Sequence, residues 1–275
     1  MTTPEIRVSS EWLALREAAD SAARAMDLVD RLQERLPSTG ALVIHDLGCG
    51  TGAMARWLAP LLRGPQHWIL HDRDPSLLAV AVSQPPGLAT DGAVVTLETR
   101  QSDIIRLRAG DLAGATLITA SALLDMLTGE ELSELLAVCV EAGCPVLLTL
   151  SVVGRVELTP ADPLDRRVAT AFDAHQRRVT ERGRLLGPDA VAVAMRQLAQ
   201  LGVEVLVRPS PWRLGPSEAQ LAAEWFTGWV NAGCEQEAEL AAEVVPYVRR
   251  RLAQMAAGAL LVMVDHADLL ISPSR

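Results

Sequence analysis

Residues 43–52, Val43-Ile44-His45-Asp46-Leu47-Gly48-Cys49-Gly50-Thr51-Gly52, decide the fold. An apolar run typical of a buried strand ends in an acid and a loop with glycine on alternate positions, and an apolar segment expected to be helical, residues 53–62, follows directly. Glycine permits the sharp turn and lets a ligand approach the backbone N–H groups at the start of that helix, where a Cβ would obstruct it. The pattern predicts a nucleoside-cofactor pocket at the end of the first strand of an α/β sheet.

The loop alone leaves the cofactor open. The spacing Gly48-x-Gly50-x-x-Ala53 also satisfies a relaxed dinucleotide fingerprint. Asp46 stands two residues before the first glycine, where its carboxylate can accept hydrogen bonds from a cationic amino group. S-adenosylmethionine carries such a group and NAD does not. Residues 46–52 therefore resemble the first motif of the class I S-adenosylmethionine-dependent methyltransferases.

The next strands extend this resemblance. Residues 67–72 form a short apolar run that ends in Asp72, where an acid can take both ribose hydroxyls of an adenosine cofactor, NAD included. Asp74 precedes a proline and is predicted to be the N-cap of the following helix. A third strand, 93–98, leads to Ser102 and Asp103, which resemble the family's acid that contacts the adenine amino group. A solvated turn is the alternative interpretation of these two residues.

A fourth strand, residues 116–121, leads into 121–127, where the family places residues close to the methyl donor. Cys49 is interpreted as a small residue that fills a tight turn, not as a nucleophile. The resemblance implies a cofactor-binding set of Asp46, Gly48, Cys49, Gly50, Gly52, Asp72, Ser102, Asp103 and Ser121.

Three residues are candidate catalytic bases. Asp125 follows the fourth strand, where a carboxylate can hold or deprotonate a nucleophile, although it could equally cap the nearby turn. His175, on an expected helix from 164 to 181, and His266, on the last strand, carry imidazoles that titrate near neutral pH. A lone histidine is more often structural, so both alternatives stay open.

The whole chain is predicted to be one domain of 275 residues. Its expected fold is α/β, a Rossmann-like doubly wound and mostly parallel seven-stranded sheet with a helical N-terminal segment and an inserted helical cap. The N-terminal segment is 1–40, with one helix from Ser10 to Leu36, the cofactor core is 41–152, and 153–275 supplies the cap and the rest of the sheet. In the family such an N-terminal helix often packs across the cofactor mouth.

Four charged residues of that first helix could consequently face the substrate, although charges at helical spacing usually support the helix itself: Arg16, Glu17, Asp20 and Arg24. Farther along, residues 209–214 are expected to be a turn after the sixth strand, 203–208. A helical pair, 216–231 and 235–257, then precedes the last strand, 260–271, and could build a substrate lid or a homodimer surface.

Composition limits the classes of function. The net charge is −9, with 34 acidic against 25 basic residues, which argues against a nucleic-acid partner. The sequence contains no lysine, which removes Schiff-base chemistry and the P-loop lysine, and its alanine- and arginine-rich composition suggests a GC-rich bacterial genome. Its four cysteines are scattered, so no metal site or disulfide framework is expected. Residues 1–5 lack a leader pattern and no apolar run is long enough to span a membrane, which predicts a soluble, cytoplasmic protein without a membrane partner.

The sequence therefore predicts transfer of a methyl group from S-adenosylmethionine to a small-molecule acceptor by direct in-line displacement. Two alternatives stay open. An NAD(P)-dependent oxidoreductase would use the same glycines and Asp72, but it leaves Asp46 unexplained. A non-catalytic S-adenosylmethionine-binding protein is the other, because residues 121–127 carry no substrate-diagnostic motif.

Overall fold

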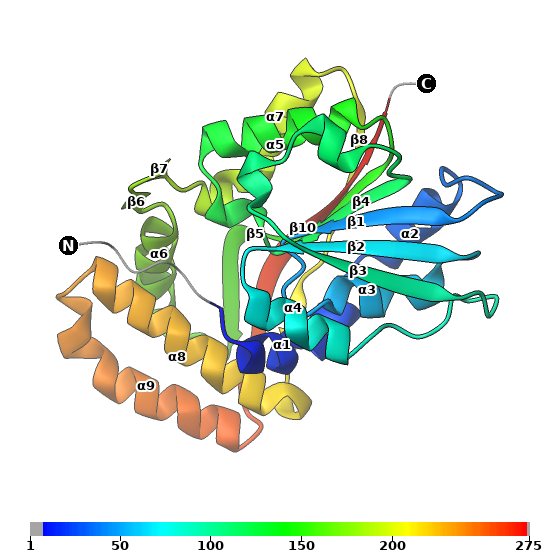
Figure 1. Cartoon of the computed structure of the whole chain (residues 1–275). Coiled ribbons are helices and arrows are strands. Elements are labelled where there is room, and N and C mark those ends of the chain that lie inside the picture. Colours follow the sequence, from blue (N-terminus) through cyan, green and yellow to red (C-terminus); the bar gives the residue numbers. More distant parts are fainter. Residues whose placement is uncertain (1–7, 274–275) are drawn as a thin grey trace.

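The centre of the fold is an eight-stranded sheet with the strand order β3-β2-β1-β4-β5-β10-β8 and with β9 paired to β10 (Figure 1). The computed structural model describes residues 8–273. Five consecutive strands pair in parallel, and they are β1 (Leu42–Leu47), β2 (Gln66–Asp72), β3 (Val95–Gln101), β4 (Leu117–Ser121) and β5 (Val146–Thr159). The order reverses between β1 and β4, and in open α/β sheets a ligand binds at such a switch point.

The far side of the sheet departs from this parallel arrangement. Strand β10 (Leu261–Ser272) runs antiparallel to β5, to β8 (Glu204–Pro209) and to β9 (Trp212–Leu214). The Rossmann-like, mostly parallel sheet is confirmed, but the expected count of seven strands is wrong by one. Residues 209–214, expected to be a turn, include β9, because Trp212, Arg213 and Leu214 pair with the first half of β10.

Helices cover both faces of the sheet (Figure 1). One hydrophobic core lies under α2 (Met26–Gln33), α3 (Ala53–Leu58) and α4 (Pro75–Ser83). The core of the opposite face lies under α5 (Gly129–Glu141) and α7 (Ala190–Gln200). Asp74 caps α4 by accepting the N–H of Ser76 at 2.8 Å, as predicted.

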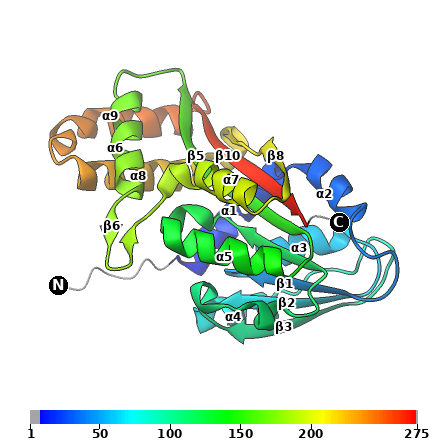
Figure 2. The ribbon, with the colours of Figure 1, turned by 90° about the horizontal axis from the view of Figure 1, so that it is seen from above.

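A third core supports a cap beside the sheet (Figure 2). Strands β5 and β10 continue past the other strands and stay paired as far as Thr159 and Leu261. Helices α6 (Asp165–Gln176), α8 (Ala219–Gln236) and α9 (Leu240–Ala256) pack on this extension. The expected helix 164–181 ends earlier, and a short hairpin, β6 (Val179–Thr180) and β7 (Gly183–Arg184), takes its last residues.

The N-terminal helix is not continuous, contrary to expectation. Helix α1 (Ser10–Ala23) begins at Ser9, whose hydroxyl accepts the N–H of Trp12, and it ends where Arg24 adopts φ −58° and ψ 139°. Helix α2 begins two residues later, at Met26. The break turns α1 away from the sheet toward the cap, and it places the side chain of Arg24 in the interior.

Residues 1–7 and 274–275 lie outside the described residues, and so does the expected absence of a leader in 1–5. Within residues 8–273, no helix is long and apolar enough to cross a membrane.

Candidate cofactor and acceptor site

A cavity of about 740 Å³ opens at the carboxyl ends of β1, β2 and β4 and extends under α1 into the cap. Most of the predicted site residues line it: Asp46, Gly48, Cys49, Gly50, Asp72, Ser102, Asp103, Ser121, Asp125 and His266. Gly52 and His175 are not among the lining residues. The sheet thus brings residues from five separate segments to one cavity.

The glycine loop has a backbone that other residues rarely adopt. Gly48 and Gly50 have φ of 66° and 54°, in the left-handed region. A Cβ on Gly50 would lie 3.0 Å from Cδ1 of Leu13 on α1. Gly52 has φ 81° and faces α4, where a Cβ on this residue would lie 3.2 Å from Cβ of Ala81. The glycines therefore keep the loop close to α1 on one side and to α4 on the other.

Asp72 fixes this loop to the end of β2. Its two oxygens accept the N–H of Gly50 at 2.8 Å and the N–H of Asp74 at 2.9 Å. A carboxylate has about four acceptor positions, so Asp72 retains capacity for the hydroxyls of a ribose beside the loop. Cys49 is buried in the same turn, and burial raises the pKa of its thiol, which is therefore not a thiolate nucleophile.

Asp46 is a buried acid with one unused oxygen. The register of β1 against β4 places Asp46 beside Thr119, whose hydroxyl donates to Oδ1 at 2.8 Å. The other oxygen, Oδ2, is buried and has no hydrogen-bond partner among the described residues. Desolvation raises the pKa of Asp46 to about 7. A ligand that brings a cationic donor to Oδ2 would satisfy this carboxylate.

Arg24 is the matching buried cation on the same cavity. Its Nη2 donates to the hydroxyl of Ser121 at 3.2 Å, and its Nε donates to the hydroxyl of Thr149 at 3.4 Å. Its Nη1 is buried without a partner among residues 8–273. The guanidinium lies 4.9 Å from the ring centroid of Trp57. Burial lowers the pKa of Arg24 against the opposing effect of the Asp20, Asp268 and Asp46 carboxylates, and Nη1 stays an open donor that a ligand acceptor could use.

Sequence analysis grouped Arg24 with three other charges of one helix and gave it no cofactor role. The burial of Arg24 on the cavity follows from the break between α1 and α2. The spacing of apolar residues in 10–36 did not predict that break. Ser121, expected to contact the cofactor, also orients this arginine.

Ser102 and Asp103, the residues predicted to contact an adenine, line the cavity directly after β3. The side chain of Asp103 accepts the N–H of Ile105 at 3.3 Å, which is the turn interaction that the sequence left as an alternative. The hydroxyl of Ser102 lies 3.0 Å from Nδ1 of His71, whose Nε2 is 3.0 Å from Nδ1 of His45. Burial lowers the pKa of both histidines to about 4, so this row of side chains is uncharged near neutral pH.

The other end of the cavity holds Asp125 and His266. Asp125 lies in a single 3-10 turn, Leu124–Met126, and desolvation raises its pKa to about 6. His266 is buried on β10, and desolvation lowers its pKa to about 3, so its ring is neutral. Its Nδ1 is buried without a partner among the described residues. Of the two, only Asp125 titrates near the pH at which a general base is useful.

His175 lies apart from these groups. Its Nε2 is 3.1 Å from a carboxylate oxygen of Glu235 on α8, which joins two helices of the cap. A catalytic role for His175 therefore has no support from its surroundings, whereas Asp125 and His266 share one cavity.

Aromatic side chains from four elements complete the wall, and they are Trp12 of α1, Phe172 of α6, Trp212 of β9 and Trp225 of α8. Trp225 stacks on Trp229 at 5.3 Å between ring centroids. The position of Trp225 on the cavity wall was not predicted, because two tryptophans four residues apart on a helix are expected to pack together in the core.

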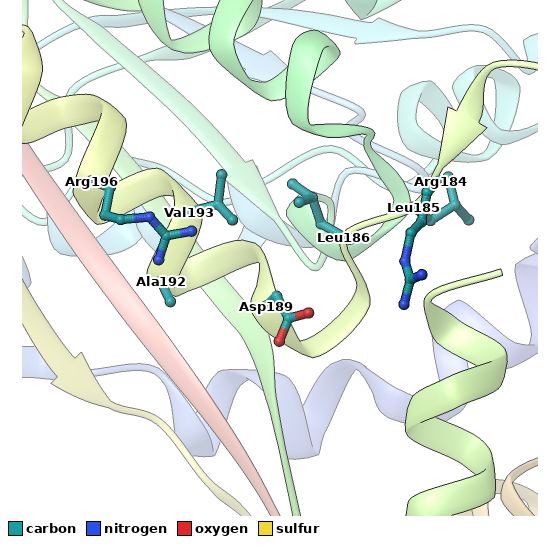
Figure 3. Close-up of a pocket in the computed structure, with 7 residues that line it drawn as sticks. All are labelled: Arg184, Leu185, Leu186, Asp189, Ala192, Val193 and Arg196. Atoms are coloured by element: carbon teal, nitrogen blue, oxygen red, sulfur yellow. The ribbon is translucent and has the colours of Figure 1, made fainter. Parts of the chain in front are cut away.

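A second, smaller hollow of about 350 Å³ lies on the surface between the β6-β7 hairpin and α7 (Figure 3). Arg184 and Arg196 stand on its two sides with Asp189 between them. The carboxylate of Asp189 already accepts from Arg177 at 2.6 Å and 2.8 Å. Among residues 8–273 no group of three His, Cys, Asp or Glu side chains could hold a metal ion.

Comparison with protein-family models and with curated proteins finds no match. Among solved structures, the chain is similar to the cyclopropane synthase MmaA2 from Mycobacterium tuberculosis, with 13% identity over 96% of this chain and 94% of that one and a TM-score of 0.49. It is also similar to magnesium protoporphyrin IX methyltransferase from Synechocystis PCC 6803 with bound SAH, with 15% identity over 76% and 84% of the two chains and a TM-score of 0.44. A geranyl diphosphate methyltransferase in complex with SAM has 12% identity over 87% and 84% and a TM-score of 0.43.

Proposed function

We propose that this protein is a class I S-adenosylmethionine-dependent methyltransferase that acts on a small-molecule acceptor. The observation that carries the proposal is the pair formed by Asp46 Oδ2 and Arg24 Nη1, two buried and unpartnered groups of opposite charge on one cavity. An α-amino acid end satisfies both, since its ammonium can donate to Asp46 and its carboxylate can accept from Arg24. S-adenosylmethionine has such an end beside its adenosine.

The remaining cofactor contacts are assigned to residues with free capacity. The loop 48–52 approaches the ligand closely, Asp72 accepts from the ribose hydroxyls, and Ser102 and Asp103 lie at the adenine end. The pyrophosphate of NAD could accept from Arg24, but NAD has no ammonium group for Asp46 and would leave its Oδ2 unsatisfied, which disfavours the oxidoreductase alternative.

The bound cofactor supplies a methyl group on a positively charged sulfur, which is reactive toward a nucleophile placed in line with it. The protein's part is to align the acceptor, exclude water and take a proton. Asp125 is the residue assigned to the proton, because its carboxylate has a raised pKa of about 6 and lines the acceptor end. This assignment favours an enzyme over a non-catalytic binding protein.

Calorimetric titration tests the proposal with four ligands side by side: S-adenosylmethionine, S-adenosylhomocysteine, methylthioadenosine and NADH. Methylthioadenosine keeps the adenosine and lacks the amino acid end. We expect the first two ligands to bind at least about tenfold more tightly than methylthioadenosine, since they gain two charge-assisted contacts. Tighter binding of NADH, or equal binding of all three adenosyl ligands, would contradict the proposal. The bacterial origin, the cytoplasmic location and the homodimer stay predictions.

A further inference from the structure

The end of the cavity that holds Asp125 and His266, called here the acceptor end, is rich in aromatic rings for this chain. The sequence contains six Trp, one Tyr and two Phe, and four of these rings line the one cavity. They come from α1, α6, β9 and α8, so the fold gathers them from both ends of the sequence. Aromatic walls contact flat rings by offset stacking or edge-to-face packing. The aromatic side chains of this wall favour an aromatic acceptor over an aliphatic one.

The charges at this end are mostly paired within the protein. Arg16 donates to both oxygens of Asp20 at 2.9 Å and 3.2 Å, and Arg182 donates to Glu131 at 2.8 Å. Asp125, in contrast, forms no ion pair with any described residue. An anionic acceptor would be repelled by this carboxylate, and Arg16 and Arg182, already paired with Asp20 and Glu131, attract it less than free cations would.

A cationic acceptor is disfavoured as well. Arg16 lies 4.9 Å from the ring centroid of Trp212, where it occupies a position that a bound ammonium would need. The carboxylate of Asp125 would attract a cation, but a cation paired with it would block the proton transfer assigned to this residue. An uncharged acceptor avoids both conflicts.

Two buried polar atoms on the wall lack hydrogen-bond partners. They are Nδ1 of His266 and Oε1 of Gln176, and no described residue satisfies either. A hydroxyl both donates and accepts, so a ligand hydroxyl can satisfy Nδ1 in either tautomer of the neutral ring as well as the amide oxygen. The acceptor should therefore carry more than one hydroxyl group.

We propose, building on the methyl-transfer function above, that the acceptor is a flat, uncharged aromatic compound with at least two hydroxyl groups. One hydroxyl oxygen uses a lone pair to bond the methyl carbon, the carbon–sulfur bond breaks with its electron pair kept by sulfur, and the hydroxyl proton passes to Asp125. A second hydroxyl donates to His266 or Gln176 and orients the ring between the aromatic side chains.

The test titrates the full chain, loaded with S-adenosylhomocysteine, with four probes of matched size. They are a dihydroxynaphthalene, its saturated decalin diol, a hydroxynaphthoate anion and a hydroxynaphthylmethylammonium cation. We expect the dihydroxynaphthalene to bind about tenfold more tightly than each of the others. A tenfold difference in affinity is the order of magnitude expected from the loss of one aromatic contact or from one mismatched charge. Equal affinity for the decalin diol, or a preference for either charged probe, would overturn the inference.

Variants locate the probe in the cavity. Phe172→Leu and Trp12→Leu should each weaken binding of the dihydroxynaphthalene several-fold, whereas Val179→Ala, on the exposed hairpin and 75% exposed, should not. Melting temperature and affinity for S-adenosylhomocysteine report whether each variant is folded. If the wild-type protein does not bind S-adenosylhomocysteine, the proposed function itself fails. If it binds this ligand but ranks the four probes differently, only the inference about the acceptor fails.

Discussion

The carboxylate of Asp268 on β10 accepts the backbone N–H of Ala25 at 2.8 Å, although 243 positions separate the two residues. Its other oxygen accepts the N–H of Leu150 at 2.8 Å and the hydroxyl of Ser210 at 2.5 Å. Ala25 lies in the break between α1 and α2. Asp268 therefore fixes the point at which the chain turns, and with it the position of Arg24 on the cavity.

Replacement of Asp268 by alanine should reduce both stability and cofactor affinity. The change leaves three buried donors without an acceptor, and we expect the free energy of unfolding to fall by about 3 kcal/mol. Urea unfolding measures this change. Asp265→Ala is the matched control on the same strand. Among residues 8–273 the carboxylate of Asp265 has one ion pair, 3.5 Å from the exposed Arg155, and its loss should cost less than about 0.5 kcal/mol. Similar losses in both variants would contradict the positioning role of Asp268.

Arg24→Met should weaken S-adenosylhomocysteine binding without a matching effect on methylthioadenosine. Methionine keeps much of the packing against Trp57 and removes the charged donor. We expect the affinity for S-adenosylhomocysteine to fall about ten- to hundredfold, the range of a hydrogen bond to a charged group. Arg31→Met is the control, because the side chain of Arg31 is 57% exposed and, among the described residues, pairs only with Glu34. An equal loss for methylthioadenosine would mean that Arg24 does not contact the amino acid end.

The sequence predicted the cofactor half of the fold well because its signals are local. An apolar strand, a glycine loop and an acid at the strand end are contiguous, and parallel pairing then brings Asp46 and Asp72 to the same edge. The role of Arg24 depends on a helix break fixed by Asp268, more than 240 positions away, and no local pattern carries it. The eighth strand was missed for a related reason, since Trp212 pairs with a partner strand 50 residues later.

Cofactor affinity should depend on pH through Asp46. In the free protein the pKa of Asp46 is raised to about 7, so below that pH the carboxyl is protonated, whereas an ammonium partner favours the ionised form. Affinity for S-adenosylhomocysteine should therefore rise as pH increases from about 6 to about 8, with proton release on binding at the lower end. Calorimetry in buffers of different ionisation enthalpy measures the released proton.

The same raised pKa also affects stability in the absence of ligand. A carboxyl whose folded pKa lies above its unfolded value of 3.8 favours folding at low pH, and this contribution is lost as pH rises through about 7. Asp46→Asn should remove this trend and the pH dependence of binding together. The affinity for methylthioadenosine, which has no ammonium, should not change over this pH range. If that affinity depends on pH as steeply as the affinity for S-adenosylhomocysteine does, the titrating group is not Asp46.

Asp125→Asn should separate turnover from binding. Asparagine cannot take the acceptor's proton, so we expect methyl transfer to slow about a hundred- to ten-thousandfold while the affinity for S-adenosylhomocysteine stays unchanged. In the wild-type protein the rate should rise with pH through about 6, as Asp125 ionises. Glu130→Gln, an exposed acid a few residues away, is the control. If the methyl-transfer rate of the Asp125→Asn variant increases with pH in the same way, the base is another residue.

Gly50 and Gly92 form a matched pair that separates backbone strain from contact. Both have positive φ, 54° and 82°, but a Cβ on Gly92 meets nothing within 4 Å, whereas one on Gly50 lies 3.0 Å from Leu13. Gly92→Ala should lower the free energy of unfolding by about 1 kcal/mol and leave S-adenosylhomocysteine affinity unchanged. Gly50→Ala should show that cost and, in addition, lose more than about tenfold in affinity, because the methyl group stands where the ligand approaches the loop N–H groups and displaces α1.

Leu13→Ala in the Gly50→Ala background should recover stability but not affinity. Full recovery of affinity would mean that the position of α1, and not access to the loop, limits cofactor binding.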